Sequence, residues 1–166
     1  MLKDKIILIT GASAGIGQAC AEAFAHEGCR LILAARRRDH LEGLATRLAN
    51  AHSSEPYLLV LDVRDHRAVE AAVSGLPPDW SAIDLLINNA GLSRGLDKLH
   101  EARPVDWEEM IDTNLKGLLW VSRAVIPGMV QRDRGHIINI GSIAAACLPS
   151  VAFKRLIAAG SRTKGI

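Results

Sequence analysis

Hydrophobic residues recur along the chain as short continuous runs rather than in strict alternation with polar residues. Continuous apolar runs of five or six residues are typical of strands that are buried on both faces of a sheet. We therefore expect five such strands. Their ranges are Lys5–Thr10, Arg30–Ala35, Pro56–Leu61, Ile83–Asn88 and His136–Ile140.

Between these runs, the apolar residues follow helical spacing. Leu41, Leu44 and Leu48 lie on one face of a helix, which indicates an amphipathic segment. Gly28 stands where a helix is expected to end, and Asp65 stands where a side chain is expected to cap a helix start. The expected helices span Ile16–Glu27, Asp39–Ala51, Asp65–Ser74 and Val105–Met129.

Strands and helices thus alternate along the chain, and this order predicts an α/β fold. Strand–helix–strand units build parallel sheets with right-handed crossovers and place helices on both faces. We therefore expect a doubly wound parallel sheet of about five strands. A chain of 166 residues corresponds to about one domain. The segment 75–81 is expected to be a loop inside that domain.

Charge and composition exclude several classes of protein. The 20 basic and 18 acidic residues leave a net charge of +2, so there is no basic excess to bind the phosphates of a nucleic acid. No stretch approaches the ~18 consecutive apolar residues of a membrane span, and the first residues contain no apolar signal region. We therefore expect a cytoplasmic protein that binds neither nucleic acid nor membrane.

Cysteine and histidine spacing predicts neither disulfides nor a metal site. Cys20, Cys29 and Cys147 are scattered along the chain, which is typical of free thiols in a reducing compartment. The six histidines form no cluster at ligand spacing, with each other or with cysteine. We therefore expect no bound metal.

A glycine-rich turn, TGASAGIG at residues 10–17, joins the first expected strand to the first expected helix. Glycines let the backbone turn tightly and approach a ligand, and the following helix presents free N–H groups and the positive end of its dipole. This placement favours binding of a dinucleotide pyrophosphate, as in a Rossmann-type fold. A P-loop is excluded because no Gly-Lys-Ser/Thr follows. For the glycines taken alone, a tight turn without a ligand is the alternative.

The end of the second strand distinguishes two nicotinamide cofactors. Folds that bind NAD place an acidic residue there to hold the ribose 2′-hydroxyl. This chain instead has Arg36, Arg37 and Arg38, and guanidinium groups form bidentate, charge-assisted bonds with phosphate. We therefore expect NADP (NADPH) rather than NAD. The alternative, a solvated helix flank, is weakened because basic residues at a helix start oppose its dipole.

Five short motifs follow one another in order along residues 5–142. They are TGASAGIG at 10–17, DV at 62–63, NNAG at 88–91, DTNLKG at 112–117 and INIGS at 138–142. Together they resemble the short-chain dehydrogenase/reductase family. Segments 77–80, 106–113 and 123–130 are most similar to its NADP-dependent branch that acts on serine and 3-hydroxy acids. The resemblance implies hydride transfer between nicotinamide and a small hydroxy or oxo substrate.

The same resemblance implies which residues hold the cofactor. The cofactor phosphates would be cradled by Gly11, Ser13, Ala14, Gly15, Ile16 and Gly17. Arg36 and Arg37 would take the 2′-phosphate. Asp62 and Val63 would flank the adenine, with Asp62 accepting a hydrogen bond from its amino group. The adenosine ribose would be lined, and the central strand braced, by Asn89, Ala90 and Gly91.

Two catalytic roles are implied as well. Asn114 would kink its helix and hold a water for proton relay, and Ser142 would hydrogen-bond the substrate oxygen and stabilise developing charge. Outside the motifs, Asn114 is an ordinary surface residue of a helix and Ser142 a turn residue. Asp62 likewise has the alternative role of capping a loop.

The residues after Ser142 depart from the family pattern. The family's mechanism uses a tyrosine general acid/base about a dozen residues after the serine, and a lysine four residues further on that lowers the tyrosine pKa. No tyrosine follows Ser142, and the single tyrosine, Tyr57, is expected to pack within the third strand. Lys164 has Gly160 where the tyrosine belongs, so we interpret it as a chance match.

The segment 148–166 loses the resemblance altogether. We expect residues 1–147 to form the dinucleotide-binding domain, and residues 148–166 to be a divergent segment rather than a second domain. A change of reading frame near Leu148 with early termination is one hypothesis, which sequencing the gene would test. Most of the interface of the family's homo-oligomer would then be absent.

Three functions remain open from the sequence. The first is an NADP-dependent oxidoreductase of the short-chain type. The second is a catalytically impaired, truncated NADP-binding fragment that lacks the active-site tyrosine. The third is an interaction module that keeps only the fold, and retained cofactor binding distinguishes the second from the third.

Overall fold

The sheet is built from five parallel strands in the order β3-β2-β1-β4-β5. The computed structural model describes residues 2–52, 55–95, 97–98 and 100–142. The strands are β1 (Ile6–Thr10), β2 (Arg30–Ala35), β3 (Tyr57–Val60), β4 (Leu85–Asn88) and β5 (His136–Asn139). The predicted α/β class with a parallel, doubly wound sheet is confirmed, and the apolar runs of the three central strands, β1, β2 and β4, are buried on both faces.

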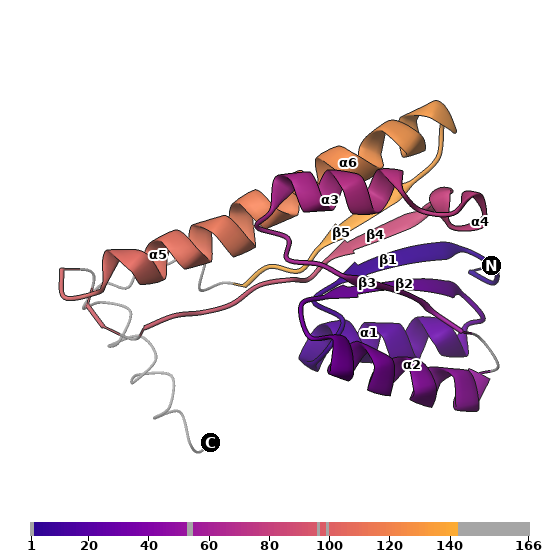
Figure 1. Cartoon of the computed structure of the whole chain (residues 1–166), viewed down its shortest axis with the longest axis horizontal. Coiled ribbons are helices and arrows are strands. Elements are labelled where there is room, and N and C mark those ends of the chain that lie inside the picture. Colours follow the sequence, from indigo (N-terminus) through magenta and orange to yellow (C-terminus); the bar gives the residue numbers. More distant parts are fainter. Residues whose placement is uncertain (1, 53–54, 96, 99, 143–166) are drawn as a thin grey trace, which may run out of the picture.

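Helices cover both faces of this sheet (Figure 1). On one face lie α1 (Gly15–His26) and α2 (Arg38–His52), and on the other lie α3 (His66–Ser74) and α6 (Leu118–Gln131). Successive strand residues point to opposite faces, so Ile7 and Ile9 pack with α1 and α2, whereas Leu8 packs with α3 and α6. Two separate hydrophobic cores therefore enclose the sheet.

Both predicted helix-end residues have the geometry expected of them. The Oδ1 atom of Asp65 accepts hydrogen bonds from the backbone N–H groups of Arg67 and Ala68, each at 3.0 Å, and so caps α3. Gly28 follows α1 with φ of +75°, the left-handed conformation that ends many helices. Its N–H donates to the carbonyl of Ala25 at 3.0 Å.

The segment 75–81 is not wholly a loop as expected, because Pro78–Ser81 forms the short helix α4. Proline suits the first helical position, where its fixed φ is already helical and its missing N–H would have no partner. Packing also stabilises this turn, since the guanidinium of Arg30 lies 4.3 Å from the ring centroid of Trp80.

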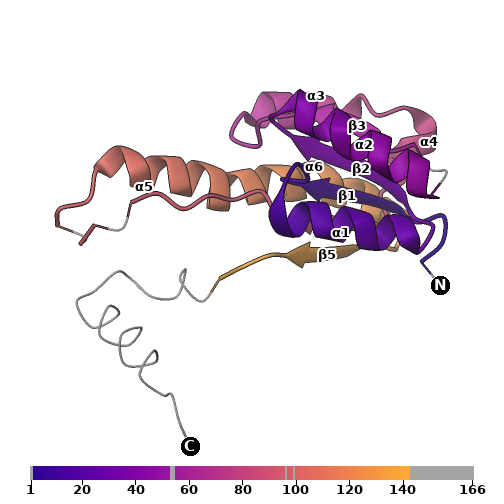
Figure 2. The same ribbon diagram turned by 90° about the horizontal axis from the view of Figure 1, so that it is seen from below.

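The expected long helix at 105–129 is a continuous stretch of three segments. They are α5 (Pro104–Met110), the π-helical turn η1 (Ile111–Gly117) and α6. Figures 1 and 2 show that α5 projects beyond the carboxyl ends of the strands, so η1 lies where the stretch begins to pack on the domain. Periodicity predicted the helix but not the π segment, because a single π-helical turn shifts the spacing of apolar residues too little to be recognised in the sequence.

Close packing joins η1 to the loop after β3. A Cβ atom added at Gly117 would lie 2.6 Å from Cγ2 and 3.1 Å from Cβ of Val63. Only glycine therefore lets the helix approach Val63 at this distance.

We expect Gly117→Ala to lower the free energy of unfolding by about 1–3 kcal/mol, because overpacking displaces the backbone or Val63. Urea denaturation measures this change. Gly43→Ala in α2 is the matched control, since its nearest neighbour would be a flexible arginine end 4.0 Å away. At position 43 the substitution should raise the free energy of unfolding by about 0.5–1 kcal/mol. Equal behaviour of the two variants would contradict the packing account.

Candidate dinucleotide-binding site

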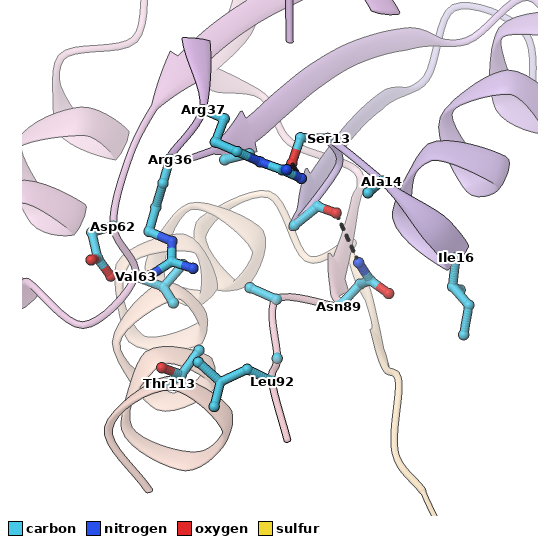
Figure 3. Close-up of a pocket in the computed structure, with 14 residues that line it drawn as sticks. Ser13, Ala14, Ile16, Arg36, Arg37, Asp62, Val63, Asn89, Leu92 and Thr113 are labelled. Carbon is cyan, nitrogen blue, oxygen red and sulfur yellow. Dashed lines mark hydrogen bonds between the residues drawn. The ribbon is translucent and has the colours of Figure 1, made fainter. Parts of the chain in front are cut away.

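A pocket of about 360 Å³ opens at the carboxyl ends of the strands (Figure 3). It lies where the strand order reverses, between β1 and β4, which is where ligands bind in open parallel sheets. The lining residues are Gly11, Ser13, Ala14, Ile16, Ala35, Arg36, Arg37, Asp62, Val63, Asn89, Ala90, Gly91, Leu92 and Thr113. The structure thus brings most of the cofactor residues expected from the sequence to one place.

The glycine-rich turn leaves the start of α1 open toward this pocket. Gly11 and Gly15 have φ of +65° and +57°, a conformation that other residues adopt rarely. Ala14 is the N-cap of α1 and provides no side-chain cap, and the first turn contains no acidic residue. The backbone N–H groups and the positive dipole end are therefore available to an anion.

Gly15 and Gly17 are outside the lining of the pocket and shape the turn instead. At Gly17 a Cβ atom would overlap the Nδ2 of Asn89 and the carbonyl oxygen of Gly11. The missing side chain at Gly17 therefore lets α1 approach the neighbouring loop.

Hydrogen bonds fasten the loop after β4 to the glycine-rich turn. The Oγ1 of Thr10 accepts from the backbone N–H groups of Asn89 and Ala90, both at 3.0 Å, and donates to the carbonyl of Ile87 at 3.3 Å. The Nδ2 of Asn89 donates to the carbonyls of Thr10 at 3.0 Å and Gly11 at 3.2 Å. Figure 3 shows the bond to Gly11. Asn89 therefore braces the central strands.

Arg36 and Arg37 bring positive charge to the end of β2. Figure 3 shows Arg36 extending toward Val63 and Arg37 extending toward Ser13. The Nη2 of Arg37 donates to the Oγ of Ser13 at 3.3 Å. Among the described residues Arg36 forms no ion pair, so its guanidinium is available to a ligand in the pocket.

Asp62 is held in place by its neighbour Arg64. Its Oδ1 accepts from the backbone N–H and the Nε of Arg64, each at 3.0 Å, and its Oδ2 accepts from Nη2 at 2.6 Å. The side-chain hydrogen bond from Arg64 is the main cause of a lowered pKa of Asp62; burial opposes it as the second-largest effect, and the backbone hydrogen bond adds a smaller lowering. The carboxylate therefore stays ionised near neutral pH.

Asn114 lies on η1 and holds the loop that follows β4. Its Oδ1 accepts from the N–H of Leu92 and its Nδ2 donates to the carbonyl of Leu92, both at 2.8 Å. Asn114 lies within the π segment, and its implied roles in kinking the helix and in holding a water stay predictions. Ala35, Leu92 and Thr113 were missed from the sequence as lining residues, although Thr113 belongs to the motif around Asn114.

Ser142 is the last residue of the described part of the chain and follows β5 by three positions. Residues 143–166 lie outside that part. The predictions for Cys147, for Lys164 and for the boundary at residue 147 therefore fall beyond it. Tyr57 lies in β3, where its ring centroid is 5.6 Å from that of Trp80, consistent with the expected packing role.

Other chemistries have little support in the described ranges. No group of three or more histidine, cysteine or acidic residues there is arranged to hold a metal ion. Cys20 and Cys29 are free thiols, and burial raises the pKa of Cys29. No helix found within those ranges has both the length and the apolar character needed to cross a membrane.

The fold and the pocket define a nucleotide-binding α/β protein, and sequence comparison gives its family. The profile of the family described as short chain dehydrogenase matches residues 5–153. The chain therefore belongs to the short-chain dehydrogenase family, and the resemblance drawn from the five motifs is confirmed.

Two curated relatives have activities in their names. The chain is 47% identical over 141 residues to the NADP-dependent 3-hydroxy acid dehydrogenase YdfG of Shigella flexneri, covering 85% of this chain and 55% of that protein. It is 40% identical over 139 residues to the serine 3-dehydrogenase of Rhizobium radiobacter, covering 84% and 54% respectively. The chain thus spans about half the length of these relatives.

Solved structures agree with the fold. A crystal structure of serine dehydrogenase from Escherichia coli matches with a TM-score of 0.81 and 43% identity, covering 95% of this chain and 75% of that one. A closed form of serine dehydrogenase complexed with NADP+ also matches with a TM-score of 0.81, at 42% identity, covering 95% and 65%.

The Asp62–Arg64 pair should make stability depend on pH. Because the folded-state pKa of Asp62 is lowered, its contribution is complete above the unfolded value of about 3.9 and is lost as pH falls through the folded value. We expect Asp62→Asn to cost about 0.5–1 kcal/mol in urea denaturation at pH 6. That difference should shrink below about pH 4. In an Arg64→Gln background the effect of Asp62→Asn should no longer depend on pH. An effect of Asp62→Asn that is the same at every pH in the unaltered chain would contradict the pair's role.

Proposed function

We propose that this chain binds NADP(H) in the pocket at the β1–β4 crevice, as an oxidoreductase of the short-chain type. The observation that carries the proposal is the pair Arg36 and Arg37, which face the pocket where an NAD-binding protein would have a carboxylate. Guanidinium groups at this point match a ribose 2′-phosphate in charge and in bidentate geometry.

The rest of the pocket fits the same cofactor. The uncapped start of α1 and the turn at Gly11 and Gly15 would receive the pyrophosphate. Val63, Asp62 and Thr113 would surround the adenine at the other side. The buried Oγ1 of Thr113 has no hydrogen-bond partner within the described residues, so a polar ligand atom there would satisfy it.

The substrate is proposed from the relatives' names. The related proteins are called 3-hydroxy acid and serine dehydrogenases, so a small hydroxy or oxo acid of this kind is the proposed substrate. A bound nicotinamide would supply the hydride chemistry itself. Ser142 would donate a hydrogen bond to the substrate oxygen, and Asn114 would keep the loop at Leu92 in place beside it.

Binding of NADP(H) without efficient turnover is the second candidate function. It is favoured by the position of the single tyrosine, Tyr57, which packs against Trp80 in β3, and by the lack of any tyrosine after Ser142. The proton transfer that this residue type performs in the family would then lack its usual donor. The divergent segment 148–166 would act as an extension of the nucleotide-binding domain 1–147 and not as a domain.

Fluorescence titration of the purified chain with NADPH, with NADH as competitor, tests cofactor binding. We expect tighter binding of NADPH, and a loss of at least about tenfold in affinity for Arg36→Asp, because a phosphate contact becomes a repulsion. Arg38→Asp is the matched control, since Arg38 pairs with Glu42 on α2 and is outside the pocket. Equal effects of the two substitutions would contradict the assignment of Arg36.

An assay of NADP+ reduction with L-serine and with 3-hydroxy acids distinguishes the two candidates. Removing a general acid/base costs about 10²–10⁴ in rate, so we expect turnover lower by that factor than in a serine dehydrogenase measured alongside. Ser142→Ala should lower any residual turnover further. Cofactor binding with no turnover would select the second candidate, and turnover at the relative's rate would exclude it.

A further inference from the structure

Four side chains of alternating charge extend from the adenine side of the pocket to the loop after β4. The Nη2 of Arg64 lies 2.6 Å from Oδ2 of Asp62, and its Nη1 lies 3.6 Å from Oε1 of Glu109. Arg94 completes the chain with bonds to both oxygens of Glu109, at 2.7 and 3.2 Å. The network contains two acids and two arginines, so its own charge is zero.

This network joins three separate segments of the chain. Asp62 and Arg64 belong to the turn between β3 and α3, Glu109 belongs to α5, and Arg94 belongs to the loop after β4. Asp62 is the one member of the network that lines the pocket. Arg64 and Glu109 therefore act on a ligand through Asp62 rather than by contact.

Arg36 and Arg37 share the pocket with Asp62, and Arg36 is the one of the two that acts on the pKa of Asp62. The pKa of Asp62 is lowered chiefly by its hydrogen bond from Arg64, and Arg36 adds a weaker effect of the same sign. The pKa of Glu109 is likewise lowered first by Arg94 and also by Arg36. The charge of Arg36 is therefore within electrostatic range of both acids, although it forms no ion pair among the described residues.

A carboxylate without a partner in this position would oppose binding of a 2′-phosphate in two ways. It would attract the guanidinium of Arg36 away from the phosphate, and its own negative charge would repel the phosphate. In the structure Arg64 occupies both oxygens of Asp62, which prevents the first effect and neutralises the second.

We propose that Arg64 is a specificity-determining residue for the ribose 2′-phosphate, because it pairs with Asp62 and leaves Arg36 free to bind the ligand. Glu109 is the positioning residue that holds Arg64 from the side of α5. The inference rests on the proposed NADP(H) site. A merely structural role of the network would instead alter the binding of phosphorylated and unphosphorylated ribose alike.

Isothermal titration of the whole chain with 2′,5′-ADP and with 5′-AMP separates these roles, because the two probes differ at the 2′-position alone. For Arg64→Gln we expect the preference for 2′,5′-ADP over 5′-AMP to fall about three- to tenfold, the effect of one exposed carboxylate acting across the pocket. Arg64→Lys keeps the charge but not the bidentate geometry, so its preference for 2′,5′-ADP should lie between that of the unaltered chain and that of Arg64→Gln.

The double variant Arg64→Gln/Asp62→Asn provides the sharpest test, because removing the unmasked carboxylate should restore the preference. Arg47→Gln is the matched charge control, since Arg47 lies on α2, pairs with Glu22 at 3.9 Å and is outside the pocket. It should leave the preference unchanged. Thermal unfolding of each variant confirms that a folded protein is compared.

Two results would overturn the proposal while leaving the proposed function intact. One is an equal loss of affinity for both probes in Arg64→Gln. The other is a double variant, Arg64→Gln/Asp62→Asn, whose preference for 2′,5′-ADP stays as low as that of Arg64→Gln. Failure of the unaltered chain to bind 2′,5′-ADP more tightly than 5′-AMP would instead overturn the proposed NADP(H) site, and the role of Arg64 with it.

Discussion

The parallel pairing of β1 with β4 is the constraint on which the rest of the structure depends. After β4 joins β1 on the side opposite β2, the connections from the two strands leave toward opposite faces and open a crevice. Hydrogen bonds from Thr10 and Asn89 then hold the two crevice loops together. The turn at Gly11 and the start of α1 are positioned by this junction, and so is the pocket.

Electrostatics in the pocket follow from what the surrounding elements leave unpaired. The start of α1 has no capping side chain and no acidic residue in its first turn, while Arg36 contributes a charge without an ion-pair partner in the described ranges. The remaining acids near the pocket are neutralised, because Arg64 pairs with Asp62 and Arg94 pairs with Glu109. The result is a pocket whose unpaired positive charge favours an anion.

Local patterns predicted the elements well where one force dominates. Strands buried on both faces have continuous runs of apolar residues. Asp65 and Gly28 are residue types preferred at helix starts and helix ends, respectively. Prediction was weaker where the alternatives are close in energy. The segment Pro78–Ser81 is a short helix in which Trp80 packs against Arg30, and the π segment Ile111–Gly117 approaches Val63 closely at Gly117.

The sequence by itself determined the class of fold, the glycine-rich turn before the first helix and the arginines at the end of β2, because each depends on residues close together in the chain. The tertiary structure alone decided that Thr113 lines the pocket, that Asn114 forms hydrogen bonds with the backbone of Leu92, and that Glu109 forms an ion pair with Arg64. These contacts join residues from separate elements. Their formation depends on how α5 and η1 pack against the sheet, which no local pattern of residues encodes.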